Sequence, residues 1–352
     1  MIRRRQTKIV KIGKMPIGGC KPICVQSMTN TNTGNINKTV AQIKQLEKAG
    51  CEIVRVAVPD QKAARAISAI KSKINIPLVA DIHFSADLAL EAIDQGIDKV
   101  RINPGNIQPK SKIEKVVLKC KAKKVPIRIG VNAGSLEKTI LRKFKGKATA
   151  QGMVESALSH IKILESLKFK NIIISLKASD IDRTVSAYRM LSKKVRYPLH
   201  VGVTEAGTRF RGTIMSSIGI GMLLYDGIGD TIRVSLTDNP VEEIPVAWEI
   251  LSALGLRRRK PTVTSCPTCG RTEIDVIRLA KQVEKIVENI NKDMRIAVMG
   301  CVVNGPGEAR EADLAVIGGK KIGLLCKRGK VIKKVKEADL LSEFKKELKK
   351  MT

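Results

Sequence analysis

The sequence has few aromatic residues and few acids. Phe, Trp and Tyr make up 3% of the 352 residues, and 65 lysines and arginines face 33 aspartates and glutamates, a formal net charge of +32. Such a charge invites a nucleic-acid role. However, scarce aromatics leave few platforms on which single-stranded bases could stack, and the lysines are spread along the chain. We therefore interpret the charge as a lysine-rich solvated surface and expect no nucleic-acid partner.

Long hydrophobic runs are also missing, although hydrophobic residues make up 43% of the chain, enough for a packed core. No apolar stretch is long enough to span a bilayer, so we expect no membrane association. The basic start lacks the apolar segment of a secretory signal, which favours a cytoplasmic protein. The eight cysteines then indicate metal binding, catalysis or burial. We expect burial for Cys20, Cys24, Cys51 and Cys120, in or beside apolar runs.

The remaining cysteines form a metal-ligand pattern that lacks a fourth thiol. Cys266 and Cys269 form a C-x2-C pair, Cys301 follows about thirty residues later, and Glu308 lies seven residues beyond it. A structural zinc site is normally closed by a fourth Cys or His. Three thiolates and a carboxylate suit an iron–sulfur cluster that does chemistry, because one iron then differs from the others. The alternative is a zinc-stabilised nucleic-acid-binding protein in which Cys326 closes the site.

Between residues 20 and 255, short apolar runs alternate with amphipathic stretches. The runs cover residues 22–28, 52–58, 76–82, 99–102, 125–131, 171–176, 199–203 and 231–236. Helical periodicity marks residues 38–49, 61–74, 86–95, 153–167 and 241–254. This alternation predicts a parallel sheet, and eight units is the number that closes a (β/α)8 TIM barrel. The segment after the first run is not the Gly-rich turn of an open nucleotide-binding sheet, and residues 8–19 are typical of a hairpin that plugs the N-terminal mouth.

The composition changes after a polar hinge at residues 256–261. Beyond it the pattern predicts a helix at 274–291, a strand at 295–299, a β-rich segment at 314–331 and a basic helix at 340–350. We therefore predict an α/β protein with two domains. A TIM-barrel domain for substrate binding spans residues 1–256, and a small α+β domain that holds the iron–sulfur cluster spans residues 262–352.

Basic residues gather at the C-terminal ends of the predicted barrel strands, where a TIM barrel places its chemistry. They lie on five different strands and are Arg55, Arg101, Arg128, Lys177 and Arg233. So many cations with few acids cannot neutralise one another, so they require an anionic ligand. Arginine forks and a lysine charge suit phosphate oxygens, and we infer a compact ligand with two or more phosphoryl groups.

Other polar residues share these strand ends. Asp81 and Glu205 are the carboxylates, and we consider both as candidates for proton transfer. His83 is either a donor to the substrate or a residue that supports another side chain. Asn132 and Ser235 belong to the predicted strands that also carry Arg128 and Arg233.

These residues resemble those of the bacterial 4-hydroxy-3-methylbut-2-en-1-yl diphosphate synthases, iron–sulfur enzymes of non-mevalonate isoprenoid synthesis. The matching stretches are residues 81–84, 101–106, 130–136, 202–207, 227–236, 265–271 and 300–308. They run through both predicted domains, so the resemblance covers nearly the whole chain. It favours this family over a metal-free barrel transferase of the dihydropteroate synthase type, in which the cysteine-bearing domain would have no role.

The resemblance implies a reaction and a cofactor. The family opens the ring of 2-C-methyl-D-erythritol 2,4-cyclodiphosphate and removes a hydroxyl with two electrons from reduced ferredoxin or flavodoxin. Carried over here, a four-iron four-sulfur cluster would be held by Cys266, Cys269, Cys301 and Glu308. The basic strand-end residues, with Asn132 and Ser235, would bind the cyclic diphosphate.

The resemblance also implies a homodimer in which the C-terminal domain of one subunit caps the barrel of the other. One departure stands out, because family members usually carry lysine where this chain has Met215.

Overall fold

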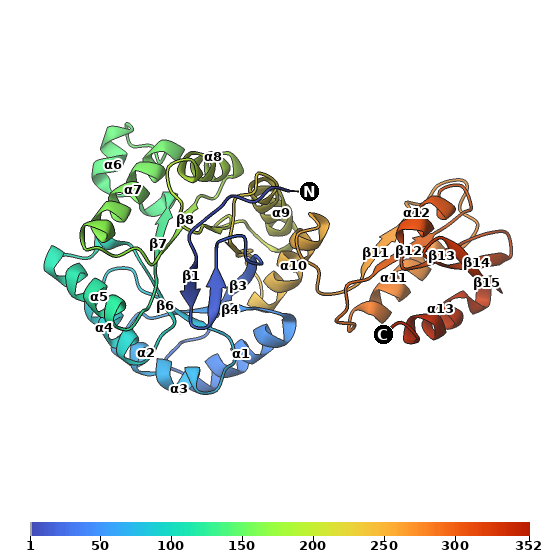
Figure 1. The fold of residues 1–352 in the computed structure, drawn as a ribbon, viewed down its shortest axis with the longest axis horizontal. Coiled ribbons are helices and arrows are strands. Elements are labelled where there is room, and N and C mark those ends of the chain that lie inside the picture. Colours follow the sequence, from blue (N-terminus) through green and yellow to red (C-terminus); the bar gives the residue numbers. More distant parts are fainter. Residues whose placement is uncertain (1) are drawn as a thin grey trace. The chain divides into compact units, whose positions relative to one another are not determined.

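The computed structural model describes residues 2–352, and the chain divides into two compact units, with the second running from Arg258 to Thr352 (Figure 1). Within the described residues, no helix is both long and apolar enough to cross a membrane.

The first unit is built on a ring of eight parallel strands. They are β3 (Cys24–Met28), β4 (Ile53–Ala57), β5 (Leu78–Asp81), β6 (Lys99–Ile102), β7 (Ile127–Asn132), β8 (Ile172–Lys177), β9 (His200–Val201) and β10 (Thr231–Ile232). Their order is β8-β7-β6-β5-β4-β3-β10-β9, and a parallel bridge between Ile174 and Leu199 brings the two ends of this sheet together. Each strand overlaps one predicted apolar run, so the TIM-barrel prediction is confirmed.

Helices follow the strands and form an outer ring (Figure 1). They are α1 (Ile36–Ala49), α2 (Gln61–Arg65), α3 (Ile67–Lys71), α4 (Ala86–Asp94), α5 (Lys110–Ala122), α6 (Lys138–Lys143), α7 (Ala150–Ser166), α8 (Ile181–Ser192), α9 (Arg209–Tyr225) and α10 (Glu243–Ala253). The first is typical: the Asn35 side chain accepts from Lys38 N, Ile43 and Leu46 are buried, and Gly50 ends the helix at φ 107°. The predicted single helix at 61–74 is instead two helices that meet at Ala66.

A hairpin closes the N-terminal end of the barrel. β1 (Val10–Ile12) pairs antiparallel with β2 (Met15–Ile17). Ile12 and Ile17 are fully buried in one cluster with Cys24 and Ile53, the first residues of β3 and β4. The predicted plug is therefore confirmed, and the carboxyl ends of the strands form the open mouth.

The cysteines of the first unit do not all behave alike. Cys24, Cys51 and Cys120 are buried, as predicted, and burial raises the pKa of each thiol to about 12. Cys20 is exposed, so its predicted burial is wrong. It lies in the turn after β2 with φ 60°, outside the apolar run that begins at Ile23.

The second unit is a mixed five-stranded sheet between helices. Its strands, in spatial order, are β11 (Thr262–Ser265), β12 (Arg295–Met299), β13 (Leu314–Ile317), β14 (Ile322–Lys327) and β15 (Lys330–Lys336). The first three are parallel and the last two antiparallel. α11 (Val276–Val287) and α13 (Leu340–Lys349) share one buried apolar cluster with the sheet, and α12 (Gly305–Glu311) contributes to another.

Candidate active site

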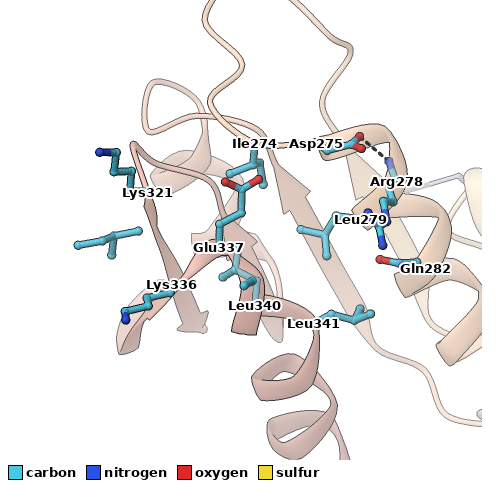
Figure 2. A pocket seen from close by; sticks show the side chains of 12 residues that line it. Ile274, Asp275, Arg278, Leu279, Gln282, Lys321, Lys336, Glu337, Leu340 and Leu341 are labelled. Atoms are coloured by element: carbon cyan, nitrogen blue, oxygen red, sulfur yellow. Dashed lines mark hydrogen bonds between the residues drawn. The ribbon is translucent and has the colours of Figure 1, made fainter.

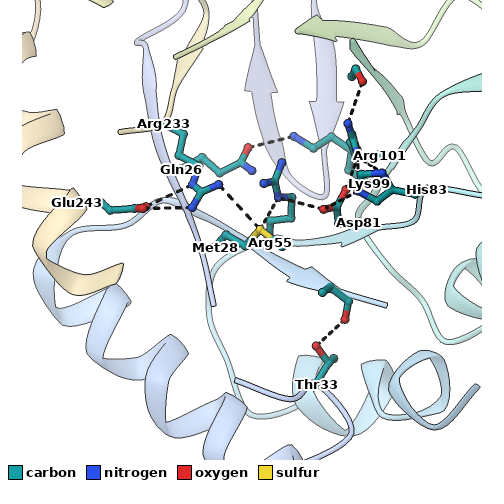
Figure 3. Close-up of polar contacts among 12 residues, drawn as sticks. Gln26, Met28, Thr33, Arg55, Asp81, His83, Lys99, Arg101, Arg233 and Glu243 are labelled. Atoms are coloured by element: carbon teal, nitrogen blue, oxygen red, sulfur yellow. Dashed lines mark hydrogen bonds and ion pairs between the residues drawn. The ribbon is translucent and has the colours of Figure 1, made fainter. Parts of the chain in front are cut away.

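Asp81 anchors the barrel mouth at the end of β5 (Figure 3). Its Oδ1 lies 3.1 Å from Arg101 Nη1, and its Oδ2 lies 3.9 Å from Arg55 Nε and 3.6 Å from His83 Nε2. Burial disfavours the ionised carboxyl, but Arg55, the His83 hydrogen bond and Arg101 outweigh burial and hold the pKa of Asp81 well below its usual range. Asp81 is therefore ionised and can accept a proton or orient cations.

Arg233 has a partner that the sequence reasoning missed. Its Nε and Nη2 lie 3.3 and 3.2 Å from the two carboxylate oxygens of Glu243, which also accepts from Ser27 Oγ at 2.8 Å (Figure 3). Glu243 is the first residue of α10 and lies inside the helix predicted at 241–254. One feature of the fold could have indicated Glu243 as a site residue. In a TIM barrel, each helix begins near the mouth, because the chain reverses direction after the strand. Arg233 is thus neutralised within the protein.

Arg128 and Lys177 remain without an acid. Arg128 is 1% exposed and Lys177 6% exposed. Arg128 Nε and Nη1 have no hydrogen-bond partner in the described part of the chain, nor does either residue form an ion pair there. Burial lowers the pKa of both, and repulsion from neighbouring arginines adds to it. The buried, unpartnered donors of Arg128 and the buried ammonium of Lys177 without an ion pair are both costly, so these two residues fit a ligand that supplies oxygens.

Glycines make room for two of the long basic side chains. A Cβ at position 130 would lie 2.3 Å from Arg101 Nε, and one at position 202 would lie 2.9 Å from Lys177 Nζ. Both glycines are on barrel strands or directly after one. The inward space that a TIM barrel normally fills with aliphatic side chains is therefore occupied by cations.

The other predicted residues lie around the mouth with different exposure. Asn132 ends β7 and Ser235 follows β10, both half-buried. His83 is 45% exposed, and Arg101 Nη1 lies 2.6 Å from its Nε2. Glu205, in the loop after β9, is exposed and has φ 54°, a left-handed conformation that non-glycine residues adopt at some cost.

Below the mouth lies a polar group that the sequence reasoning did not assign. Lys99, Gln26 and His200 are all at most 1% exposed, and Lys99 Nζ reaches across the barrel to Gln26 Oε1 at 3.4 Å (Figure 3). Burial, with repulsion from Arg128 and Arg55, lowers the pKa of Lys99 well below its usual value. Lys99 was not predicted as a site residue because it lies in an apolar run. It can point into the barrel because β6 alternates inward and outward residues.

In the second unit, the predicted cysteine ligands lie on loops at one end of the sheet, and the predicted carboxylate ligand lies on a helix. Cys266 directly follows β11, Cys301 follows β12 by one residue, and Glu308 is in the first turn of α12. Gly300 N donates to Cys266 Sγ at 3.1 Å. The side chains are not gathered: in the described part of the chain, no three His, Cys, Asp or Glu groups are arranged to hold a metal ion. Cys326, the ligand of the zinc alternative, is 1% exposed in an apolar cluster.

The fold and the mouth define a TIM-barrel protein with a cationic site, joined to a separate cysteine-bearing domain. The family model described as the GcpE TIM-barrel domain matches residues 7–248, and the GcpE protein C-terminal domain matches residues 262–350. The chain belongs to the GcpE family.

Curated relatives support this assignment over the full length. The chain is 58% identical to the 4-hydroxy-3-methylbut-2-en-1-yl diphosphate synthase (flavodoxin) of Caldanaerobacter subterraneus subsp. tengcongensis, with 99% of this chain and 98% of that one covered. It is 56% identical to the protein of the same name in Listeria monocytogenes, over 99% of this chain and 94% of the relative.

Among solved structures, the barrel resembles dihydropteroate synthases. The one from Stenotrophomonas maltophilia superposes with a TM-score of 0.51 at 13% identity, covering 71% of this chain and 98% of that chain. At this identity the likeness shows the fold alone.

Proposed function

We propose that the protein is an oxidoreductase that converts 2-C-methyl-D-erythritol 2,4-cyclodiphosphate to 4-hydroxy-3-methylbut-2-en-1-yl diphosphate, by ring opening and removal of a hydroxyl with two electrons. The observation that carries the proposal is the 58% identity across both domains to a relative that bears the name of this activity. The chemistry of the barrel mouth agrees with the proposal, because its charge balance suits an anionic substrate.

The charge balance of the mouth fits a cyclic diphosphate. Five cations face three carboxylates, Asp81, Glu205 and Glu243, which leaves a formal surplus of two positive charges. The substrate carries one negative charge on each phosphoryl group. Arg128 and Lys177, which form no ion pair in the part of the chain that the structure describes, would take the phosphoryl oxygens, with Asn132 and Ser235 at the rim. Their charges would also favour the diphosphate as the leaving end when the ring opens.

We assign substrate binding to the barrel domain, residues 1–256, and the cofactor to the C-terminal domain, residues 262–352. Cys266, Cys269, Cys301 and Glu308 would hold a four-iron four-sulfur cluster, which would supply the electrons of the reduction. Three thiols and one carboxylate suit this cofactor, and the Gly300 N–H at Cys266 Sγ is the kind of hydrogen bond that tunes cluster sulfurs. The loops would have to draw the four side chains together around it.

Proton transfer falls to the two mouth carboxylates. We assign the proton donor for the departing hydroxyl to Glu205, which lies exposed in the loop after β9. Asp81 would then hold Arg55, Arg101 and His83 in place and could accept a proton. The left-handed backbone of Glu205 sets the direction of its side chain.

Reduced flavodoxin or ferredoxin would deliver the electrons, in a cytoplasmic setting. The active protein would be a homodimer whose active site is shared between subunits. An exposed apolar stripe along α9 supports dimerisation: Phe210 is 81%, Ile214 44%, Ile218 45% and Met222 39% exposed, at a spacing of one helical turn. Met215, where the family usually carries lysine, is half-buried beside this stripe and extends its apolar character.

An anaerobic assay tests the function directly. Protein reconstituted with iron and sulfide should turn over the cyclic diphosphate with dithionite and release the linear allylic diphosphate, observed by phosphorus NMR. Brown protein with full iron content but no product would contradict the proposal, and colourless protein with stoichiometric zinc would support the zinc alternative.

Subunit mixing tests the shared site. Glu205→Gln and Cys301→Ser proteins should each be inactive. If subunits exchange, mixing them should restore roughly a quarter of wild-type activity, because about half of the dimers are mixed and each carries one intact composite site. No recovery, with mixed dimers proven by mass spectrometry, would mean that each chain completes its own site.

A further inference from the structure

A groove opens at one end of the sheet in the second unit (Figure 2). It has a volume of about 960 Å³ and lies between the first turns of α11 and α13 and the adjoining ends of β14 and β15. Its floor and walls are apolar at Leu279, Ile322 and Leu340, and basic at Lys321 and Lys336. None of these residues belongs to the barrel mouth or to the proposed cluster ligands.

The groove lies at the same end of the sheet as the cysteine loops. Cys266 and Cys301 follow the carboxyl ends of parallel strands β11 and β12. β14 runs antiparallel to β13, so it begins at this end with Ile322, whose partner in the β14–β15 ladder is Lys336. The two features are also joined by backbone, because Glu273 N, one residue before the groove residue Ile274, donates to Gly300 O at 2.9 Å.

The charge around the groove has one dominant sign. Lys321 and Lys336 line the groove, and the whole segment from Leu314 to Lys336, which also reaches the opposite end of the sheet, carries eight lysines and arginines and no acid. Arg278 adds another cation to the groove wall. Of the two groove acids, Asp275 is used locally, since its side chain accepts from Arg278 N and caps α11; Glu337 is the other. The surface therefore offers cations to a partner.

Exposed apolar side chains lie among these cations. Ile322 is 52% exposed in the groove, and Ile277, in the first turn of α11, is 54% exposed. An apolar centre with a charged rim is the usual anatomy of a protein interface. Positive charge at the rim selects an acidic partner and speeds its approach.

We propose that this groove docks a small acidic electron-transfer protein of the flavodoxin type. The inference rests on the proposed function, which requires such a donor. An electron donor must approach its acceptor closely, and this end of the sheet carries the thiols. Each docking event transfers one electron and leaves the donor oxidised by one electron. Two events and two protons reduce one cyclic diphosphate, break its ring C–O bond and release one water with the linear product.

The β14–β15 ladder provides a matched control. Lys321→Glu with Lys336→Glu reverses two charges at the groove end. Lys327→Glu with Lys330→Glu reverses two charges at the opposite end of the same two strands, where Lys327 pairs with Lys330. All four lysines are exposed, so both variants should fold, and thermal melts followed by circular dichroism verify this. The milder pair Lys321→Gln with Lys336→Gln replaces the groove variant if it melts early.

The probe is a recombinant acidic flavodoxin. We expect the groove variant to bind oxidised flavodoxin about tenfold more weakly than wild-type protein in a calorimetric titration, with a weaker dependence on salt, because two attractive pairs become repulsive. Its KM for reduced flavodoxin should rise by a similar factor, while its rate with dithionite stays unchanged. The control variant should change neither quantity by more than about twofold.

Three outcomes would overturn the docking site. They are unchanged flavodoxin affinity in the groove variant, equal weakening in both variants, and dissociation of the groove variant into monomers in sedimentation velocity, which would give the groove to a second copy of this chain. Failure of the proposed function is distinguishable, because wild-type protein would then lack dithionite-driven turnover of the cyclic diphosphate.

Discussion

Arg101 lies against the bare backbone of Gly130. Its Nη2 donates to the Gly130 carbonyl oxygen at 2.8 Å while its Nη1 reaches Asp81 at 3.1 Å. A side chain on the neighbouring strand would occupy the space that the guanidinium now fills.

Gly130→Ala should therefore displace Arg101. The added Cβ would lie 2.3 Å from Arg101 Nε, and we expect substrate affinity to fall at least roughly tenfold, since small displacements of positioning groups are costly. Overpacking should also lower the free energy of unfolding by about 1–3 kcal/mol. Gly134→Ala is the control, because a Cβ there meets nothing within 4 Å. Equal affinities in the two variants would contradict the packing argument.

Lys177→Met should separate binding from stability. Loss of the charge-assisted contact should weaken substrate binding by roughly 1.5–3 kcal/mol, with a similar effect in Arg128→Ala. Because Lys177 is buried and forms no ion pair within the described residues, its removal should not lower the melting temperature. Isothermal titration and thermal melts measure the two quantities, with the exposed Lys170→Met as control. A large drop in melting temperature with intact affinity would assign Lys177 a structural role.

Lys99→Met should change the pH dependence of stability. Burial lowers the pKa of Lys99 in the folded protein, so the unfolded chain binds more protons. The free energy of unfolding contributed by this group therefore rises with pH until the unfolded pKa near about 10.4 is reached.

The variant should accordingly be more stable at neutral pH, by about 1–3 kcal/mol, and its advantage should shrink towards pH 10. Urea unfolding at several pH values measures the difference between the two proteins. A difference that grows with pH would mean that Lys99 has a stabilising partner in the barrel.

The assigned cluster ligands should fall into two classes. Cys266→Ser, Cys269→Ser and Cys301→Ser should each lose the cluster, because each thiolate would hold one iron. Glu308→Ala should keep three thiolates, so we expect a bleached or three-iron cluster with little turnover. Iron analysis and electron paramagnetic resonance measure the content, with the exposed Cys20→Ser as control. Wild-type activity in Glu308→Ala would remove the carboxylate from the ligand set.

Much of the fold was predictable because the barrel strands are buried on both sides and read as continuous apolar runs. Two elements of the second unit were missed. β11 is only four residues of Thr, Val and Ser, and α12 begins with Gly305, Pro306 and Gly307, which are poor helix formers. Such elements form because neighbouring strands and packing favour them.

The sequence predicted which kinds of residue line the barrel mouth, but not which of them form ion pairs with one another. The place of the cations at the C-terminal ends of the strands identified them, yet it could not reveal that Glu243 neutralises Arg233 or that Arg128 and Lys177 form no ion pair in the described part of the chain. Those facts depend on contacts between residues distant in sequence. Lys99 escaped attention because a single lysine in an apolar run looks like an exposed strand end.

The hairpin of β1 and β2 seals one end of the barrel with Ile12 and Ile17. In the described part of the chain, a ligand can therefore enter and leave the barrel only at the carboxyl ends of the strands. The product has to leave before the next substrate enters, so the product should inhibit competitively with respect to the substrate. Slow release of the product would then limit the rate of turnover.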